Sequence, residues 1–385
     1  MPCSCNSAVI APEKPTDISL PSDQLAHICP ESLPQLPPPY DKFEDLPVFR
    51  ELKEETRTRY EATLDDTLAV GIPRAKTKEE EQEVVDKFLS GLKKLFTAEN
   101  NWTFLEPLLL SMEHCARCQT CAEDCPVYVM SGKNEVYRPT YRSEILRRLY
   151  FKYVKPGNSL FRRFSQGDIE LNYTLVVRLF ELSYRCTLCR RCAQSCPIGV
   201  DNGLITHELR KLFSQELGWS PQELHEKGTL QQMSVGSSTG MNTIVVKDNL
   251  DFIDEDISER VGFEVKTPWD VQGADILLLE NAGEFLAWPD NHGSTAALFQ
   301  AAGVSWTMSS DLVGYDGVNY GLFYDDIQLA RVAHRHFEIA KKLGVKKIVM
   351  GECGHETKAL GVIADRVGID LPPRESILTF MRDLV

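Results

Sequence analysis

Cysteines supply the most distinctive chemistry of this chain, because eight of its twelve cysteines fall into two copies of one pattern. Each copy reads C-x2-C-x2-C-x3-C-P, at 115–126 and again at 186–197. This spacing is typical of proteins with two [4Fe–4S] clusters, where three thiolates of one run hold one cluster and the fourth holds the other. We therefore predict two [4Fe–4S] clusters as cofactors. The expected ligands are Cys115, Cys118, Cys121 and Cys196 for the first cluster, and Cys186, Cys189, Cys192 and Cys125 for the second.

Structural zinc and disulfides are the alternative uses of clustered cysteines. Zinc sites usually pair two C-x2–4-C knuckles or add histidines, and neither run has that form. Disulfides require an oxidising compartment. The chain starts without a basic segment followed by an apolar core, so no secretory signal is predicted. No apolar stretch reaches the roughly 20 residues of a membrane span. We expect a cytoplasmic protein that reaches the cytoplasmic face of a membrane only through a partner.

Charge is unevenly distributed along the chain. The net charge of −14 argues against a nucleic-acid partner. Residues 137–163 are nevertheless basic, with a single acid, Glu144. The segment is interpreted either as a solvated helix face or as a docking surface for an acidic partner or phospholipid headgroups. Its basic residues are Arg138, Arg142, Arg147, Arg148, Lys152, Lys155, Arg162 and Arg163.

The elements that must position the cysteines are predicted to be helices. Residues 1–75 are rich in proline and are expected to form an extended arm, either a disordered tail or a segment that wraps a neighbouring subunit. Apolar residues at helical spacing then predict helices over 77–98, from Pro139 to Tyr153, over 175–182 and over 205–212. Residues 76–220 are therefore predicted to form a helical ferredoxin-type domain.

After a predicted linker at 221–261, residues 262–385 change to an α/β pattern. Short apolar runs predict strands at 276–279, 304–306 and 346–350, and helices are expected between them. Asp325 and Asp326 can cap a helix that ends at Gly344. The repeat predicts a doubly wound parallel sheet, so the fold class is a multidomain α+β protein.

The other cysteines and histidines carry weaker signals. Cys353 lies in a turn, 351–355, at the carboxyl end of a predicted strand, where ligands bind in such sheets. It is interpreted either as a small buried residue or as an interface thiol. His355 receives little weight as a ligand, and His292 is interpreted as a turn residue. Cys353 could in principle form a third metal site together with Cys3, Cys5 and Cys29. This site is disfavoured, because the spacing of the four cysteines matches no known pattern.

Motifs for several other cofactors are absent from the sequence. There is no G-x-G-x-x-G after a strand, no Walker loop and no C-x-x-C-H, so NAD, flavin, ATP and haem are not predicted.

The order of parts resembles the heterodisulfide reductase (HdrD) and DsrK-like iron–sulfur protein family. The residues that carry the resemblance are the two cysteine runs, Gly351-Glu-Cys-Gly-His355 and the segment 375–384. The resemblance implies a cysteine-rich α/β module, of which 262–385 would be the first half. The resemblance further implies that, in that family, a second half with a Cys-Cys-Gly motif and further cysteines binds a noncubane [4Fe–4S] cluster that handles disulfide chemistry. This chain lacks Cys-Cys-Gly, so the expectation is a shortened homologue or a second half carried by a separate subunit.

Together these features predict an electron-transfer subunit of a multi-subunit oxidoreductase, without catalytic residues of its own. Its partners would be a catalytic subunit and an electron donor or acceptor subunit. The alternative is a catalytic heterodisulfide or disulfide reductase subunit with its substrate site in the α/β domain or shared with a partner. A third possibility is an adaptor in which the clusters serve only as folding staples, but two cross-ligated clusters argue against it.

Overall fold

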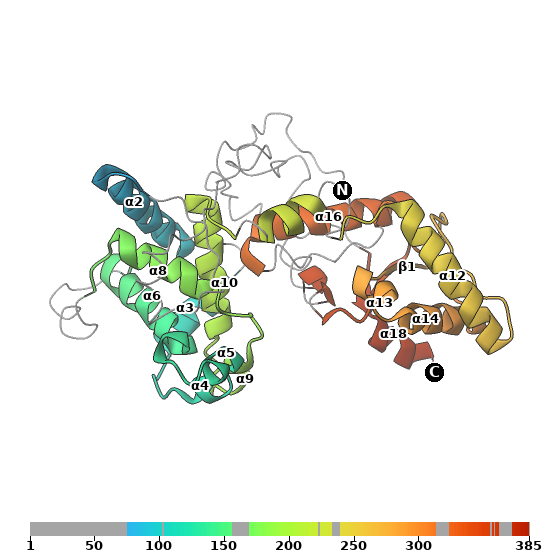
Figure 1. The fold of residues 1–385 in the computed structure, drawn as a ribbon, viewed down its shortest axis with the longest axis horizontal. Helices are drawn as coiled ribbons and strands as arrows, with labels where there is room; N and C mark the ends of the chain where they lie inside the picture. Colours follow the sequence, from blue (N-terminus) through green and yellow to red (C-terminus); the bar gives the residue numbers. More distant parts are fainter. Residues whose placement is uncertain are drawn as a thin grey trace.

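The structure, a computed structural model, describes residues 75–101, 104–155, 169–221, 224–232, 239–312, 323–354, 356–357, 359–361 and 372–384. These residues form a helical module and an α/β module (Figure 1). The segment 1–74, which holds nearly all of the predicted arm with Cys3, Cys5 and Cys29, lies outside them.

The helical module packs around α10 (Asn202–Leu212), whose residues are all buried. Helices α2 (Lys78–Leu95), α3 (Leu105–Glu113), α6 (Pro139–Tyr153) and α8 (Tyr173–Ser183) contact it on several sides. The helices predicted in this region are confirmed. Each buries part of the apolar stripe that its spacing indicated, such as Phe88, Leu92 and Leu95 of α2.

Three short helices lie within or directly after the cysteine runs. α4 (Thr120–Glu123) and α9 (Arg191–Gln194) each carry the third cysteine of a run, and they contact one another. α5 (Pro126–Met130) begins at the proline that ends the first run, because proline suits the first position of a helix. The two runs are thereby brought to the same end of the module (Figure 1).

The α/β module contains a parallel sheet in the order β2-β1-β3-β4. Its strands are β1 (Ile276–Leu279), β2 (Trp306–Thr307), β3 (Lys347–Met350) and β4 (Arg374–Ser376). Leu277 and Ile348 face a core shared with α16 (Asp326–Leu343), whereas Leu278 and Val349 face a core shared with α14 (Pro289–Ala301). Helices thus cover both faces, as expected for a doubly wound sheet. The short helices α13 (Ala282–Leu286) and α18 (Ile377–Leu384) follow β1 and β4.

Two predictions for this module differ from the structure. The second strand starts at Trp306 rather than Val304, because the Val304 N–H is bonded to the Phe299 carbonyl at the end of α14. The predicted linker at 221–261 contains a π-helical segment, Leu224–Leu230, and α12 (Thr243–Val261). α12 packs against α14 and buries Val246, Leu250, Ile253 and Ile257 in the same core as β1. Numerous acidic residues between these apolar positions obscured the helical period.

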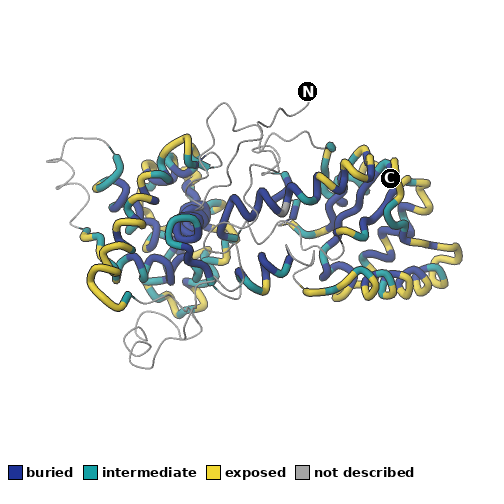
Figure 2. The backbone as a smooth tube through the Cα atoms, turned by 90° about the horizontal axis from the view of Figure 1, so that it is seen from above, coloured by how far each residue is buried: buried dark blue, intermediate teal, exposed yellow. Residues whose placement is uncertain are grey.

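Helix α16 joins the two modules. The Asp325 side chain caps it by accepting a bond from the Ile327 N–H. Asp325 also accepts bonds from Ser214 Oγ at 2.6 Å and Gln215 Nε2 at 3.0 Å, which follow α10. Figure 2 shows buried backbone continuing across the centre of the molecule between the modules.

Among the described helices, none is long and apolar enough to span a bilayer.

Candidate iron–sulfur cluster site

Thiols from both cysteine runs influence the charge state of Cys121. This cysteine is buried, whereas Cys118 is exposed and Cys115 and Cys196 are half-buried. Burial raises the pKa of the Cys121 thiol to about 11, and the next largest contributions come from Cys115, Cys196 and Cys118. These three thiols therefore lie within electrostatic range of Cys121, although Cys196 belongs to the other run.

In the second run, a thiol of the same run lies near the buried Cys192. Burial raises the pKa of the buried Cys192 thiol to about 12, and nearby Asp201 and Cys186 contribute in the same direction. The described contacts thus bring together two of the four thiols predicted for the second cluster. Cys125 and Cys189 lie in the same pair of runs, half-buried and exposed respectively.

Both runs share an unusual backbone conformation. The left-handed region is occupied at Arg117 (φ 58°) and Gln119 (φ 67°), and at the equivalent Leu188 (φ 54°) and Arg190 (φ 60°). This conformation costs a residue other than glycine about 1–2 kcal/mol. It is found where successive peptide N–H groups line a concave nest that binds an anion, as in many iron–sulfur sites. Sequence analysis missed this feature, because the residue types there give no sign of a positive φ.

Sulfur atoms of these runs already accept N–H bonds. The Leu188 N–H donates to Cys186 Sγ at 3.4 Å, and the Val200 N–H donates to Cys196 Sγ at 3.3 Å. The Asn202 amide donates to Cys121 Sγ at 3.7 Å. Donors directed at sulfur favour thiolate over thiol. The thiol donor set and these N–H groups therefore fit anionic [4Fe–4S] clusters.

Buried guanidinium groups lie near the second run. Burial acts to raise the pKa of the Cys186 thiol, but Arg142, Arg210 and hydrogen bonds from Leu188 and Thr206 together lower that pKa. Arg142 donates to Thr206 Oγ1 at 2.6 Å, and the equally buried Arg147 donates to the Met112 carbonyl at 2.8 Å. Neither arginine belongs to a solvated helix face, which corrects that interpretation of the basic segment for both. Arg162 and Arg163 lie outside the described residues.

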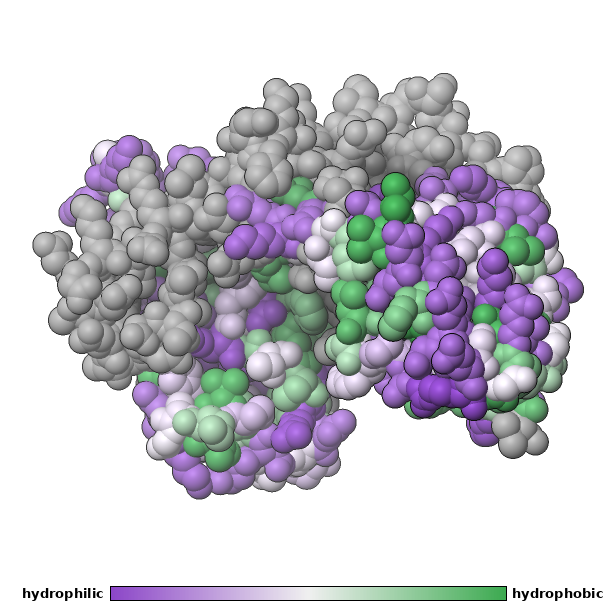
Figure 3. All heavy atoms as spheres, turned by 45° about the vertical axis from the view of Figure 1, so that its right-hand side comes forward, coloured by the Kyte–Doolittle hydropathy of each residue, from purple (hydrophilic) through white to green (hydrophobic). Residues whose placement is uncertain are grey.

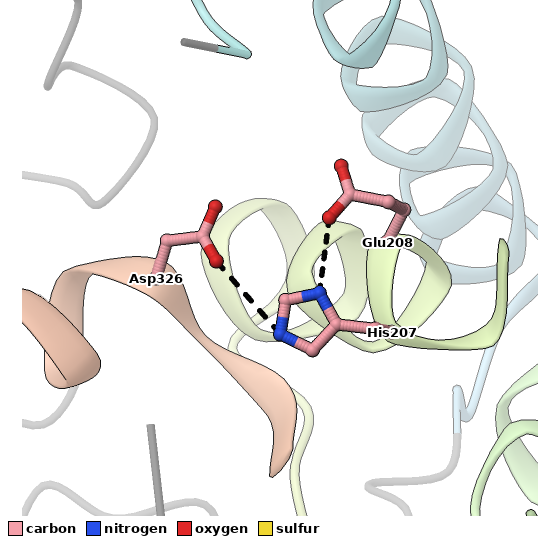
Figure 4. A group of neighbouring side chains, drawn as sticks. All are labelled: His207, Glu208 and Asp326. Atoms are coloured by element: carbon pink, nitrogen blue, oxygen red, sulfur yellow. Dashed lines mark hydrogen bonds and ion pairs between the residues drawn. The ribbon is translucent and has the colours of Figure 1, made fainter. Parts of the chain in front are cut away.

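A second group of ionisable side chains joins α10 to α16 (Figure 4). His207 Nδ1 lies 3.0 Å from Glu208 Oε1, and His207 Nε2 lies 3.8 Å from Asp326 Oδ1. Such a set could ligate a divalent metal. However, the Lys211 ammonium lies 2.7 Å from Glu208 and 2.9 Å from Asp326, so a cation already bridges both carboxylates. We interpret this group as an ion-pair junction between the modules.

Cys353 lies apart from the cluster runs, half-buried at the carboxyl end of β3. Beside it, Glu284 accepts a bond from the Glu352 N–H at 2.6 Å. A Cβ on Gly351 would collide with the Glu284 carboxylate, so the glycine makes this approach possible. Cys353 thus lies at the strand end where the sequence placed it. His355 lies outside the described residues.

His292 is a helix residue, not the turn residue that its sequence context indicated. It is fully buried in α14, with Nδ1 2.5 Å from Glu280 Oε2 and Nε2 2.8 Å from Thr267 Oγ1. Thr267 in turn bonds Asp254 at 2.9 Å. This closed network satisfies the buried polar atoms that it contains, which is a structural role.

Comparison with known proteins agrees with the motifs. Residues 111–200 match a family model described as a 4Fe–4S dicluster domain. The chain is 29% identical, over 70% of its length, to Hdr-like menaquinol oxidoreductase iron–sulfur subunit 2 of Archaeoglobus fulgidus. It is 27% identical, over 63% of its length, to an Hdr-like menaquinol oxidoreductase iron–sulfur subunit of Archaeoglobus profundus. A probable glycolate oxidase iron–sulfur subunit of Bacillus subtilis is 28% identical over 26% of this chain and 19% of its own length.

These relatives confirm the resemblance to heterodisulfide-reductase-like iron–sulfur subunits, and they support an iron–sulfur electron-transfer protein with 4Fe–4S chemistry. The chain spans about half the length of the two Archaeoglobus relatives, 47% and 44% respectively. No solved structure matches the chain.

Proposed function

We propose that this protein relays single electrons through two [4Fe–4S] clusters as a subunit of a multi-subunit oxidoreductase. The observation that carries the proposal is that α4 and α9, which hold the third cysteine of each run, contact one another. Cys115, Cys118 and Cys196 also lie within electrostatic range of Cys121. Thiols from two runs meeting in this way are what cross-ligated clusters require. The proposed ligands are those expected from the spacing, with Cys125 completing the second cluster.

The backbone and charges around the runs also support this function. Nest-like loops repeat at both runs, and Arg142 and Arg210 lower the pKa of the Cys186 thiol although it is buried. A bound [4Fe–4S] cluster supplies one-electron chemistry, and the chain's N–H groups and guanidiniums stabilise the negative charge of the thiolates.

The proposed partners are a catalytic subunit and a subunit that donates or accepts electrons. The Archaeoglobus relatives are named as subunits of a menaquinol oxidoreductase, which supports membership of a larger assembly. We place the protein in the cytoplasm, associated with the cytoplasmic face of a membrane only through such partners. The Pro-rich arm, 1–75, is proposed to contact a neighbouring subunit in that assembly.

A second candidate function is disulfide reduction at the α/β module. The position of Cys353 at the carboxyl end of β3, beside the buried Glu284, favours it. These 385 residues contain no Cys-Cys-Gly, so this function would require residues beyond them to complete the site.

Iron and acid-labile sulfide analysis of anaerobically purified protein tests the primary proposal. We expect about eight irons per chain. About four irons, or stoichiometric zinc, would overturn it. The same preparation, mixed with a disulfide and reduced viologen, distinguishes the second candidate, because an electron relay alone would not turn over the disulfide.

A further inference from the structure

A cavity of about 390 Å³ lies against the loop of the first cysteine run. Arg117 and Gln119, which flank the exposed Cys118, contribute to its wall. The N-terminal half of α6 supplies much of the remainder. The side chains important for the argument are Arg117, Arg138, Tyr141, Glu144 and Arg148.

The charge of this cavity is positive although the whole chain carries −14. Three guanidinium groups share the Glu144 carboxylate, which lies 3.0 Å from Arg117, 2.9 Å from Arg147 and 3.2 Å from Arg148. Arg138 pairs with Glu135, whose side chain is 60% exposed. The wall of the cavity therefore contains three guanidinium groups and one carboxylate. Guanidinium groups are suited to bind further carboxylates through two parallel hydrogen bonds.

The residues at the equivalent positions of the second run differ. Leu188 replaces Arg117, and Arg190, at the position of Gln119, is ion-paired with Asp201. Moreover, Arg210 donates to the Cys186 carbonyl and, at 2.9 Å, to the Phe323 carbonyl just before α16. The second run is therefore tied to the α/β module, whereas the first run faces outward.

Apolar side chains lie near the same end of the module. Met130 of α5 is 85% exposed and Val129 is 41% exposed, directly after the first run. Figure 3 shows apolar side chains grouped at the lower end of the helical module, among polar ones. An apolar patch beside a charged rim is the usual composition of a protein–protein interface.

We propose that the arginine cavity beside the first cysteine run is the docking site for an acidic one-electron carrier protein, whose carboxylates bind Arg117, Arg138 and Arg148. The proposal rests on the proposed relay function and adds its direction. Electrons would be exchanged with the carrier at the first cluster and would pass between it and the second cluster, whose cysteine run contacts the side of the α/β module. Complementary charge would accelerate the encounter at low ionic strength.

Stopped-flow reduction of the holoprotein by flavodoxin hydroquinone, an acidic carrier, tests the proposal. At an ionic strength of about 10 mM, where the Debye length is about 30 Å, we expect Arg148→Glu to slow the second-order rate at least about tenfold. Arg148→Gln is expected to slow it less. Hexaglutamate should inhibit the wild-type reaction and not that of Arg148→Glu. The control Arg260→Glu changes a 53% exposed side chain of α12, and its rate should stay within about twofold of wild type.

Reduction by the uncharged 5-deazariboflavin radical separates this proposal from the relay function. Equal rates for all variants with this reductant, together with unchanged iron content, would show intact clusters. Flavodoxin rates that fall equally for Arg148→Glu and Arg260→Glu would overturn the docking site while leaving the relay intact. Arginine-dependent binding to phosphatidylglycerol vesicles, without any effect on the flavodoxin rate, would likewise overturn it. If the anaerobically purified protein contained no iron, the relay function itself would be refuted.

Discussion

At the scale of single residues, Cys196 lies near the thiols of the other run, and cross-ligation is the main prediction. Cys196→Ser should lose the cluster built on the first run, and Cys125→Ser the cluster built on the second, each leaving about four irons per chain. Iron analysis and electron paramagnetic resonance of reduced protein measure both. If Cys196→Ser instead damaged only the cluster of its own run, each run would hold its own cluster.

Gly351 illustrates a close approach that only glycine permits. In Gly351→Ala the new Cβ would collide with the Glu284 carboxylate, so we expect a loss of about 1–3 kcal/mol in the free energy of unfolding. Anaerobic denaturant titration measures it. The matched control is Gly354→Ala, where a Cβ would meet nothing within 4 Å and little change is expected. Equal losses in the two variants would show that the approach to Glu284 is unimportant.

Glu284 also predicts a pH dependence. Burial, and then the nearby Glu280, raise the pKa of its carboxyl group to about 7. In the unfolded chain this group releases its proton near its ordinary value of 4.5. The folded state therefore binds more protons between pH 4.5 and 7, and stability falls as the pH rises through that window, by up to about 3 kcal/mol. Denaturant titrations at pH 5.5 and 7.5 should show this fall in the wild type and a smaller one in Glu284→Gln. A fall of the same size in the variant would assign the effect to other groups.

At the scale of elements, α10 connects the cluster runs to the α/β module. Its Asn202 reaches Cys121, its Arg210 reaches Cys186, and its Lys211 bridges Glu208 and Asp326 of α16. Lys211→Met would leave two buried carboxylates without their shared ammonium, and we expect a loss of about 3–5 kcal/mol in stability.

The control for that variant is Lys94→Met. Lys94 pairs with Glu216 at 3.3 Å, and its side chain is 35% exposed, so its loss should cost at most about 1 kcal/mol. Both variants are compared by anaerobic thermal unfolding. Similar melting temperatures would mean that the buried junction adds no stability to the assembly of the modules.

At the scale of the whole molecule, the two modules carry different chemistry. The cysteine runs lie in the helical module, and Cys353 lies at the end of β3 in the other. Cys353→Ala should therefore leave the iron content of the isolated chain unchanged at about eight, while electron transfer within an assembled complex could fall. Loss of about four irons from the isolated variant would revive a third cluster site.

The sequence alone predicted the cysteine spacing, the helix periods and the apolar strands, because each depends on residues close together in the chain. They predicted the 4Fe–4S chemistry, most helices and a parallel sheet in the α/β module. The linker at 221–261 was assigned incorrectly, since the burial of α12 depends on α14, which is distant in sequence. The approach of Cys196 to Cys121, the Lys211 junction and the cavity at Arg117 were decided by tertiary structure. Each depends on which segments meet after folding, and that is set by packing around α10 rather than by local sequence.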